Sequence, residues 1–435
     1  MTRNHGACDQ EAMMAKQPFF SIPLDIADVR VLQTDLTQAG ELTLTLESTV
    51  ESTTCHRCGW TITDRHASDN PRLLRHLPVL GRPVYLRIRP KRFRCPCCTD
   101  HPTTTQQRDW YDPQALHTKA YERHLLVQLV NSTISDVVAK EDVTYDALLG
   151  LLDRWIATRV DWATLPPFTT LGIDEIALTK GHRTFVAVLT GRTAQGGLHL
   201  LAVLPDRLKA TVVAWLQAMP AARRDGITTV CTDMWEGYVT ATQEVLPHAT
   251  VVIDRFHVAC QYRDAVDDLR KQEVRRLRQE LPDAARAELK RTLWPFRKRA
   301  EDLTESEQDR LDTLLAYRPA LQQAYTLREE LTRIFDTARS KADGLRRVRF
   351  WRQRVARSGL TCFQRLLKLL DTWQDLIANY FTHHATSGFV EGLNNKLKVL
   401  KRRCYGIRTV GRLFQRLTLD LDGYRRFSPW SASTH

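Results

Sequence analysis

The stretch Thr170-Leu-Gly-Ile-Asp174-Glu175-Ile-Ala-Leu178 is an apolar run interrupted by two adjacent acids. Short apolar runs of this length are typical of strands buried in a sheet. A second run, Ile227-Thr-Thr-Val-Cys231, has the same character and ends two residues before Asp233. Both runs therefore predict strands with a carboxylate inside them or directly after them.

Further strands and helices surround these two runs in a definite order. Strand patterns occur at residues 184–190, 199–204 and 250–253. Helical patterns lie between the last three strands, one running to Met219 from a candidate N-cap at Asp206 and one covering residues 235–245. Three antiparallel strands followed by helix, strand, helix and strand is the order of an RNase H-like α/β core.

This strand order brings acids together. The first and fourth strands are neighbours in such a core, so we expect Asp174 and Asp233 side by side at the ligand-binding end of the sheet. Glu175 faces the opposite way, because successive side chains on a strand alternate. Glu391, at the start of a later helix, is the third candidate. Converging carboxylates suit Mg²⁺ or Mn²⁺, and two such ions can support an in-line displacement at phosphorus.

Each acid also has a structural interpretation. Asp174 could be an ordinary strand-end residue, Asp233 an N-cap of the helix near Trp235, and Glu391 a partner of its helix dipole. The occurrence of all three at these topological positions favours a catalytic metal site formed by Asp174, Asp233 and Glu391.

The sequence after Glu391 is strongly basic. From Glu391 to Arg412 there are seven lysines and arginines and no second acid. Leu393, Leu397 and Leu400 repeat with helical spacing and predict the face that packs on the core. The remaining surface offers amide and cationic groups suited to a phosphate backbone. The DNA-binding candidates on this helix are Asn394, Asn395, Lys398, Lys401 and Arg402.

A long helical stretch separates Glu391 from the strands. From Ala259 to about His384 only helical signals occur, including a capping box at Thr304-Glu-Ser-Glu307. We interpret this stretch as an insertion into the core, and most of the charges between Arg270 and Arg299 as a solvated face.

Two cysteine pairs near the N-terminus predict a zinc ribbon. Cys55-His-Arg-Cys58 and Cys95-Pro-Cys97-Cys98 flank a strand pattern that runs into Lys91-Arg-Phe-Arg94. Four thiolates give a structural Zn²⁺ a closed tetrahedral shell, and the metal replaces a core in so small a module. Cys97 competes with Cys98 for the last position, and unliganded thiols are the alternative. The preferred zinc ligands are Cys55, Cys58, Cys95 and Cys98. A nearby histidine could replace one of them, namely His56, His66, His76 or His101. The basic residues Lys91, Arg92 and Arg94 of the same module are candidates for DNA binding.

A helix-turn-helix pattern follows the cysteines. Residues 133–140 predict a short helix, Glu141-Asp-Val a tight turn, and Thr144 the N-cap of a longer helix. If this pair binds DNA, residues Thr144, Tyr145 and Asp146 at the start of the second helix enter the major groove. A plain helical pair is the alternative.

Composition limits the class of protein. At 435 residues two to four domains are expected, and the net charge of +13 favours nucleic acid as a partner. No apolar run of spanning length and no leader peptide is apparent. We therefore expect no membrane partner, a cytoplasmic location with reduced cysteines, and association with the nucleoid when DNA is bound.

Several motifs together resemble the ISL3 family of DDE transposases from bacterial insertion sequences. They are the cysteine ribbon with Lys-Arg-Phe-Arg-Cys95, Gly-Ile-Asp174-Glu, Cys-Thr-Asp233-Met, Val-Ile-Asp254-Arg-Phe-His257-Val and Glu391-Gly-Leu-Asn-Asn-Lys-Leu-Lys398. The resemblance covers nearly the whole chain from about residue 50. One departure is the tight second cysteine knuckle, which leaves the fourth zinc ligand between Cys97 and Cys98.

The resemblance implies a metal-binding triad of Asp174, Asp233 and Glu391, and N-terminal modules that hold the terminal inverted repeats of the element. Asp254 and His257 match a family motif and are candidates for supporting the metal ligands. Because both element ends must be held together, a homodimer or larger synaptic assembly on double-stranded terminal and target DNA is expected. The expected parts are residues 1–109 with the ribbon, 110–165 with the helix-turn-helix, 168–258 with the first part of the core, 259–386 with the insertion, and 387–426 with the final core helices.

The resulting hypothesis is a transposase that cleaves DNA and transfers strands by a two-metal-ion reaction, without a covalent protein–DNA intermediate. The alternatives are a non-catalytic DNA-binding regulator or domesticated transposase, and an RNase H-like nuclease without strand transfer.

Overall fold

The computed structural model of the chain describes residues 24–177, 185–282, 292–383, 388–404, 407 and 409–429. The description excludes the side chains of residues 383, 388–391, 393 and 394. The chain divides into two compact units, Met1–Leu125 and Leu126–His435.

The first unit contains a four-stranded sheet. Its order is β1-β2-β7-β6, with β1 and β2 forming an antiparallel hairpin and β2 pairing in parallel with β7. Alternating residues such as Leu46, Leu74 and Leu86 are buried between its strands and the following segment. The strands are β1 (Val29–Leu36), β2 (Leu42–Ser48), β6 (Arg72–Val79) and β7 (Arg82–Ile88).

The cysteine pairs lie on a smaller β-module of the same unit. A two-stranded sheet, β3-β4, and a three-stranded sheet, β5-β8-β9, surround a core of only Ile62, Phe93 and cysteine side chains. A core this small is typical of modules that a metal stabilises. The strands are β3 (Thr53–Thr54), β4 (Thr61–Ile62), β5 (Arg65–Ser68), β8 (Lys91–Arg94) and β9 (Thr103–Thr105).

Three helices lead into the second unit. Helix α1 (Lys119–Leu129) crosses the boundary between the units, and α2 (Ile134–Glu141) and α3 (Tyr145–Trp155) follow. Thr133 caps α2 with a reciprocal bond pair to Asp136, and Asp142 turns the chain with a φ of 50°. Thr144 then caps α3. The two helices and the tight turn between them lie where the sequence predicted them.

A five-stranded sheet organises the second unit. Its order is β12-β11-β10-β13-β14, with β10, β11 and β12 antiparallel and β13 and β14 parallel to β10. The strands, at the predicted positions, are β10 (Thr170–Ala177), β11 (Phe185–Arg192), β12 (Leu198–Leu204), β13 (Thr229–Thr232) and β14 (Thr250–Ile253). The helices between them are α4 (Lys209–Ala218), α5 (Ala221–Asp225) and α6 (Glu236–Val245).

Helices cover both faces of this sheet. Leu171 and Ile173 of β10 pack with α4 and α6 on one face. Ile176 of β10 lies on the other face with Leu397 and Leu400 of α15 (Gly388–Arg403) and with α16 (Val410–Phe427). The helix that carries Glu391 therefore packs on the sheet, and the apolar face predicted from Leu397 and Leu400 is confirmed.

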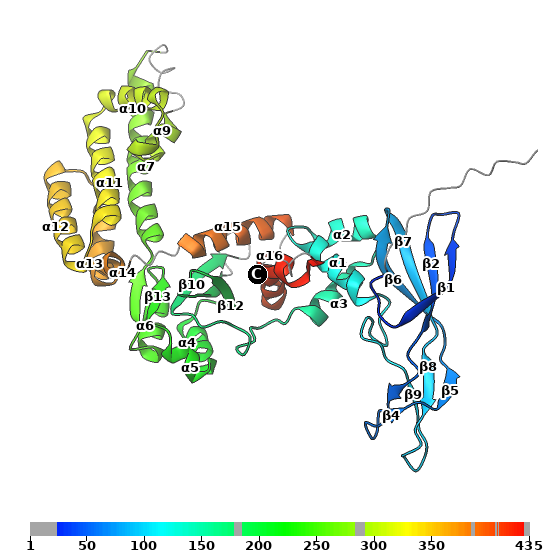
Figure 1. Cartoon of the computed structure of the whole chain (residues 1–435). Helices are drawn as coiled ribbons and strands as arrows, with labels where there is room; N and C mark the ends of the chain where they lie inside the picture. The colour runs from blue at the N-terminus through cyan, green and yellow to red at the C-terminus, as the bar shows by residue number, and fades with distance from the viewer. Residues whose placement is uncertain are drawn as a thin grey trace, which may run out of the picture. The chain divides into compact units, whose positions relative to one another are not determined.

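The stretch between β14 and α15 is helical, as predicted (Figure 1). Its apolar side chains share one core with α6 and β14, for example with Val239 and Val252. Arg270 is buried, against the expectation of a solvated face, and so are Asp267 and Arg328. They are buried because they pair with one another or bond to the backbone. The helices are α7 (Arg255–Glu280), α9 (Leu293–Arg297), the 3₁₀ turn η1 (Ala300–Asp302), α10 (Glu305–Tyr317), α11 (Pro319–Thr337), α12 (Lys341–Ser358), α13 (Gln364–Ala378) and α14 (Tyr380–His383).

Two helix starts differ from the predictions. Asp206 does not cap α4, because the helix begins at Lys209 with Leu208 as the N-cap, and Asp206 instead accepts from the Leu208 N–H. Helix α7 begins at Arg255, earlier than predicted, because the Asp254 side chain caps it by accepting from the Phe256 N–H at 2.9 Å.

Within the described part of the chain, none of the helices combines the length and the apolar character needed to span a bilayer.

Candidate active site and metal sites

The sheet places Asp174 and Asp233 on neighbouring strands. Strands β10 and β13 pair in parallel, and the last aligned pair is Ile173 with Thr232. Asp174 directly follows Ile173, and Asp233 directly follows Thr232, so the register brings the two acids level with each other. Hydrogen-bonding strands lie about 4.8 Å apart, which allows both carboxylates to reach one site.

Strand alternation separates Asp174 from its neighbour Glu175. Asp174 shares its face with Ile176, which packs against α15 and α16. Glu175 lies on the opposite face and forms an ion pair with Arg207 at 2.9 Å. The Arg207 guanidinium also lies over the Trp235 ring, 4.3 Å from its centre. Glu175 thus has a cationic partner, whereas Asp174 faces the side on which the Glu391 helix packs.

Asp233 is a half-buried acid with one buried, unsatisfied oxygen. Its Oδ1 atom is buried and makes no hydrogen bond among the described residues. It is not a helix cap, because α6 begins after Trp235, whose side chain caps nothing. The pKa of Asp233 is raised to about 7, mainly by burial; the nearby His257 lowers it and the Asp174 carboxylate adds to the rise. A carboxylate that the fold leaves unpaired is suited to a cation from solution.

His257 lies between two acids. Its Nε2 atom is 3.8 Å from a carboxylate oxygen of Asp174 and 3.8 Å from one of Asp254. Burial would lower the pKa of His257, but the neighbouring carboxylates, Asp174 first, raise it to about 9. The protein thus gathers Asp174, Asp233, Asp254 and His257 at one end of the sheet, with Asp254 also serving as the cap of α7.

Helix α15 presents the basic face predicted from the sequence. Asn395, Lys398 and Arg402 are exposed, and neither Lys398 nor Arg402 has a carboxylate within 4.0 Å in the described part of the chain. Lys401 differs, because its ammonium donates to the Ala177 carbonyl at the end of β10, and burial lowers its pKa. Glu391 lies in the first turn of this helix, and its side chain, like that of Asn394, is outside the described set.

A cleft of about 460 Å³ opens beside Asp233. Asp233, Met234 and His257 line the side formed by the sheet and α7, while Arg365, Lys368 and Trp373 line the side formed by α13. No role was predicted from the sequence for these α13 residues. With Leu369 and Thr372 they are spaced three and four residues apart, which puts them on one helix face and was the available signal.

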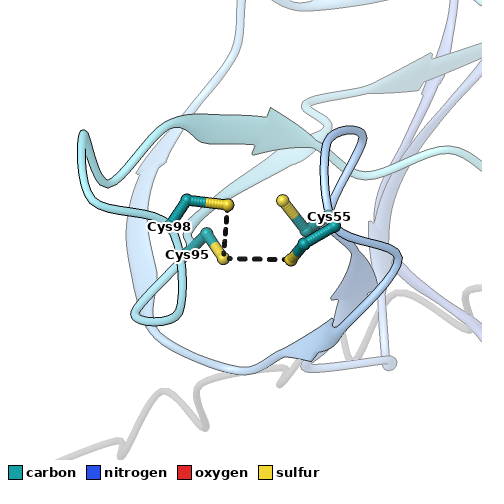
Figure 2. A group of neighbouring side chains, drawn as sticks. Cys55, Cys95 and Cys98 are labelled. Atoms are coloured by element: carbon teal, nitrogen blue, oxygen red, sulfur yellow. Dashed lines mark hydrogen bonds between the residues drawn. The ribbon is translucent and has the colours of Figure 1, made fainter.

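In the first unit, Cys55, Cys58, Cys95 and Cys98 converge. Their four sulfur atoms lie within 4.8 Å of one another, and Cys97 is outside the group. Figure 2 shows Cys55 approaching Cys95 and Cys98 from a separate loop. Backbone N–H groups of Cys58 and Arg57 lower the pKa of Cys55 to about 6, which favours a thiolate. His101 accompanies the group with a 3.0 Å contact from Nδ1 to the Cys95 carbonyl.

The basic residues beside the ribbon are placed differently from one another. Lys91 is 2% exposed and forms an ion pair with Glu51. Arg92 is half-buried and donates to Thr103, whereas Arg94 is exposed beside His66. Lys91 is therefore a weaker candidate for a phosphate contact than Arg94.

In the helix pair of the second unit, Thr144 and Tyr145 are exposed at the start of α3. The other end of α3 is fixed, because Asp153 accepts two hydrogen bonds at 2.8 Å from Arg412 of α16. Arg416 of α16 donates to the Ser132 carbonyl next to α2. The start of α3 is thus the free end of a helix pair that α16 holds.

The donor sets of the two clusters differ in chemistry. Four thiols with no further donor match the closed tetrahedral site of a structural Zn²⁺. Carboxylate oxygens, one of them unpaired, match a hard cation such as Mg²⁺ or Mn²⁺.

Comparison with known proteins gives a consistent result. A family model for ISL3 DDE proteins, described as "Transposase", matches residues 171–417. A second model, described as zinc-finger of transposase IS204/IS1001/IS1096/IS1165, matches residues 51–98.

Curated relatives agree. The chain is 27% identical over 389 residues to the transposase for insertion sequence element IS1001 of Bordetella parapertussis, covering 88% of this chain and 93% of the relative. It is 24% identical over 395 residues to the transposase for insertion sequence element IS1557 of Mycobacterium tuberculosis, covering 86% and 87%. Among solved structures, the Drosophila P element transposase strand transfer complex aligns with a TM-score of 0.35 and 11% identity over 73% of this chain and 93% of that one, a score too low to establish a shared fold.

Proposed function

Because the chain belongs to the ISL3 family of DDE transposases, we propose that it cuts DNA at the ends of an insertion sequence and joins those ends to target DNA. The observation that carries the proposal is the Asp174–Asp233 pair, level on adjacent strands, with one Asp233 oxygen buried and unpaired. An acid left in this state suits a reaction that needs a bound divalent metal.

The core is proposed to be RNase H-like and the helix pair α2–α3 to be a helix-turn-helix. The strand order β12-β11-β10-β13-β14, with one antiparallel and one parallel part, supports the first assignment. The tight turn at Asp142 and the exposed start of α3 support the second, with Thr144 and Tyr145 as the DNA-facing residues.

Asp174, Asp233 and Glu391 are proposed to hold two Mg²⁺ or Mn²⁺ ions. When bound, such ions activate an attacking oxygen and stabilise a leaving oxygen at phosphorus. The protein's part is to fix the carboxylates: β10 and β13 set Asp174 and Asp233, and α15 packs on the face toward which Asp174 points.

Asp254 and His257 are proposed to orient those carboxylates. His257 lies 3.8 Å from both Asp174 and Asp254, and Asp254 is fixed as the α7 cap. Such supporting partners set the geometry of metal ligands in many sites.

DNA is proposed to be held by several separate surfaces. The ribbon is proposed to bind Zn²⁺ through Cys55, Cys58, Cys95 and Cys98. It is also proposed to position Arg94, Arg92 and Lys91 toward double-stranded terminal repeats. On α15, the exposed residues Asn395, Lys398 and Arg402 are proposed to contact backbone phosphates near the metal site, with Asn394 and Lys401 beside them. Two element ends must be held at once, so a homodimer or larger assembly is proposed.

The test is cleavage of a duplex carrying the repeats that flank the gene, followed by product analysis. Metal-dependent 3′ cuts whose ends become joined to a second DNA support transposition. Cutting without joining supports a nuclease, and tight binding without any cutting supports a non-catalytic regulator. Asp233→Asn is the variant that removes the proposed metal ligand while keeping its size.

A further inference from the structure

The cleft beside Asp233 has two chemically different walls. On one side lie Asp233 and His257, which belong to the candidate active site. On the other side α13 contributes Arg365, Lys368 and Trp373. A space of about 460 Å³ falls within the range of pockets that bind small organic groups, roughly 300–1,000 Å³.

The α13 wall is cationic, and its two charged side chains have no carboxylate partner among the described residues. Arg365 and Lys368 are exposed, and neither has a carboxylate within 4.0 Å in the described part of the chain. Other arginines of this helical segment do form ion pairs. On α12, Arg352 pairs with Asp371 of α13, and Arg354 pairs with Glu330 of α11. Unpaired cations that face a catalytic acid are suited to an anion that lies between them.

The wall is also apolar and aromatic. Trp373 is half-buried, packs against the core of the helical segment and borders the cleft beside Leu369 and Met234. A flat aromatic ring next to cations is the combination that holds single-stranded nucleotides, with the base on the ring and the phosphate on the cations.

The position of α13 is fixed. It packs against both α7 and β14, and the Asn379 side chain directly after it donates to the Val251 carbonyl of β14 at 2.7 Å. The wall is therefore held at a set place relative to the strand end that carries Asp233.

We infer that this cleft binds one nucleotide of the DNA strand next to the phosphate that is cut, with its base against Trp373 and its phosphate on Arg365 and Lys368. The inference rests on the proposed function and assigns the helical segment a direct contact with substrate. A base in the cleft has left the duplex stack, so the strand is held open at the cleavage point.

The test uses a duplex of the flanking inverted repeat with 2-aminopurine placed in turn at the bases around the cleavage site, in the full-length protein without Mg²⁺. We expect a fluorescence change at one position on binding to wild-type protein. Trp373→Ala removes the change, and Trp373→Phe, which keeps an aromatic ring, restores it. Trp294→Ala is the matched control, because Trp294 is 67% exposed on α9 and does not line the cleft.

A second arm tests the base directly. With normal DNA, Trp373→Ala weakens binding by roughly 5- to 100-fold, the range expected for one base on an aromatic ring. With an abasic residue at the responsive position, wild-type protein and Trp373→Ala bind equally. The double variant Arg365→Ala, Lys368→Ala lowers the salt dependence of binding by about one phosphate contact. Arg349→Ala removes an exposed arginine of α12 that does not line the cleft, and it leaves the fluorescence change in place.

Equal responses from wild-type protein and Trp373→Ala at every position overturn the inference. Adding Mg²⁺ to the same samples separates the two proposals. If wild-type protein does not cut the duplex, the proposed function fails; if it cuts with no Trp373-dependent signal, only the nucleotide cleft fails.

Discussion

The two candidate metal sites are built in opposite ways. The thiol cluster takes its four donors from two short loops, and their sulfur atoms lie within 4.8 Å of one another. The carboxylate site takes donors from strands far apart in sequence and opens into a cleft beside Asp233. Closed four-thiolate sites stabilise folds, and open sites leave room for substrate. The difference agrees with the structural role proposed for the first site and the catalytic role proposed for the second.

The sharpest test of this difference is Asp233→Asn. We expect cleavage of inverted-repeat DNA to fall by more than about 100-fold, the upper end of the loss for residues that merely orient a metal ligand. Thermal stability should be unchanged or higher, because the variant removes an acid with a buried, unpaired oxygen. Activity and melting temperature are measured on the same preparation.

Asp267→Asn is the matched control for that variant. Hydrogen bonds from Arg297 and Arg270 overcome the effect of burial and lower the pKa of Asp267 to about 2. Its loss should lower stability by on the order of 1–3 kcal/mol and leave cleavage of folded protein near wild type. A stable, fully active Asp233→Asn protein would contradict the catalytic assignment.

The thiol cluster should respond in the reverse manner. We expect Cys98→Ala to lose zinc and to loosen the ribbon, whereas Cys97→Ala retains zinc, because only Cys98 lies with the other three sulfurs. Zinc content by elemental analysis and protease resistance of the ribbon provide the measurements. If Cys97→Ala loses zinc while Cys98→Ala retains it, Cys97 and not Cys98 is the fourth zinc ligand.

The pH dependence of metal binding sharpens the comparison further. The raised pKa of Asp233, about 7 against an unfolded value near 3.9, means that the folded protein retains a proton there that the unfolded chain has lost. Without metal, this residue's contribution to stability therefore falls as the pH rises from about 4 to 7. We expect Mg²⁺ to raise the melting temperature at pH 8 and to have little effect at pH 5.5, where it must displace the proton.

Asp233→Asn is again the control for the Mg²⁺ effect. In that variant the difference between pH 5.5 and pH 8 should shrink, because the group that binds the proton is absent. An Mg²⁺ effect that is equal at both pH values would contradict the assignment of the titrating group.

The smallest expected effect concerns the exposed face of α15. Lys398→Ala and Arg402→Ala should each lower the salt dependence of DNA binding by about one phosphate contact, with no change in zinc content. Lys401→Ala should change it less, because the Lys401 ammonium bonds to the Ala177 carbonyl. Binding isotherms at several salt concentrations provide the measurement.

Local patterns explain what could be predicted from the sequence. The apolar strands, the acids at their ends and the cysteine spacing are short-range signals, so the juxtaposition of Asp174 with Asp233 and the clustering of four cysteines were predicted. The cleft was not, because Trp373 meets Asp233 only through the packing of α13 on α7 and β14. Likewise, the sequence predicts a solvated face for Arg270, whereas the packing of its helix places this side chain in the interior. The spacing of residues can reveal a helix face, but it does not reveal which distant segment that face contacts.

Helix α16 has a consequence for how the protein is made. Arg416 on α16 bonds to the carbonyl of Ser132, which precedes it by 284 residues. At typical bacterial and eukaryotic synthesis rates, that separation corresponds to roughly 15–60 s between the appearance of the two partners. The α2–α3 pair therefore leaves the ribosome well before the helix that holds it. In a nascent chain, the start of α3 that is proposed to contact DNA lacks the support that orients it.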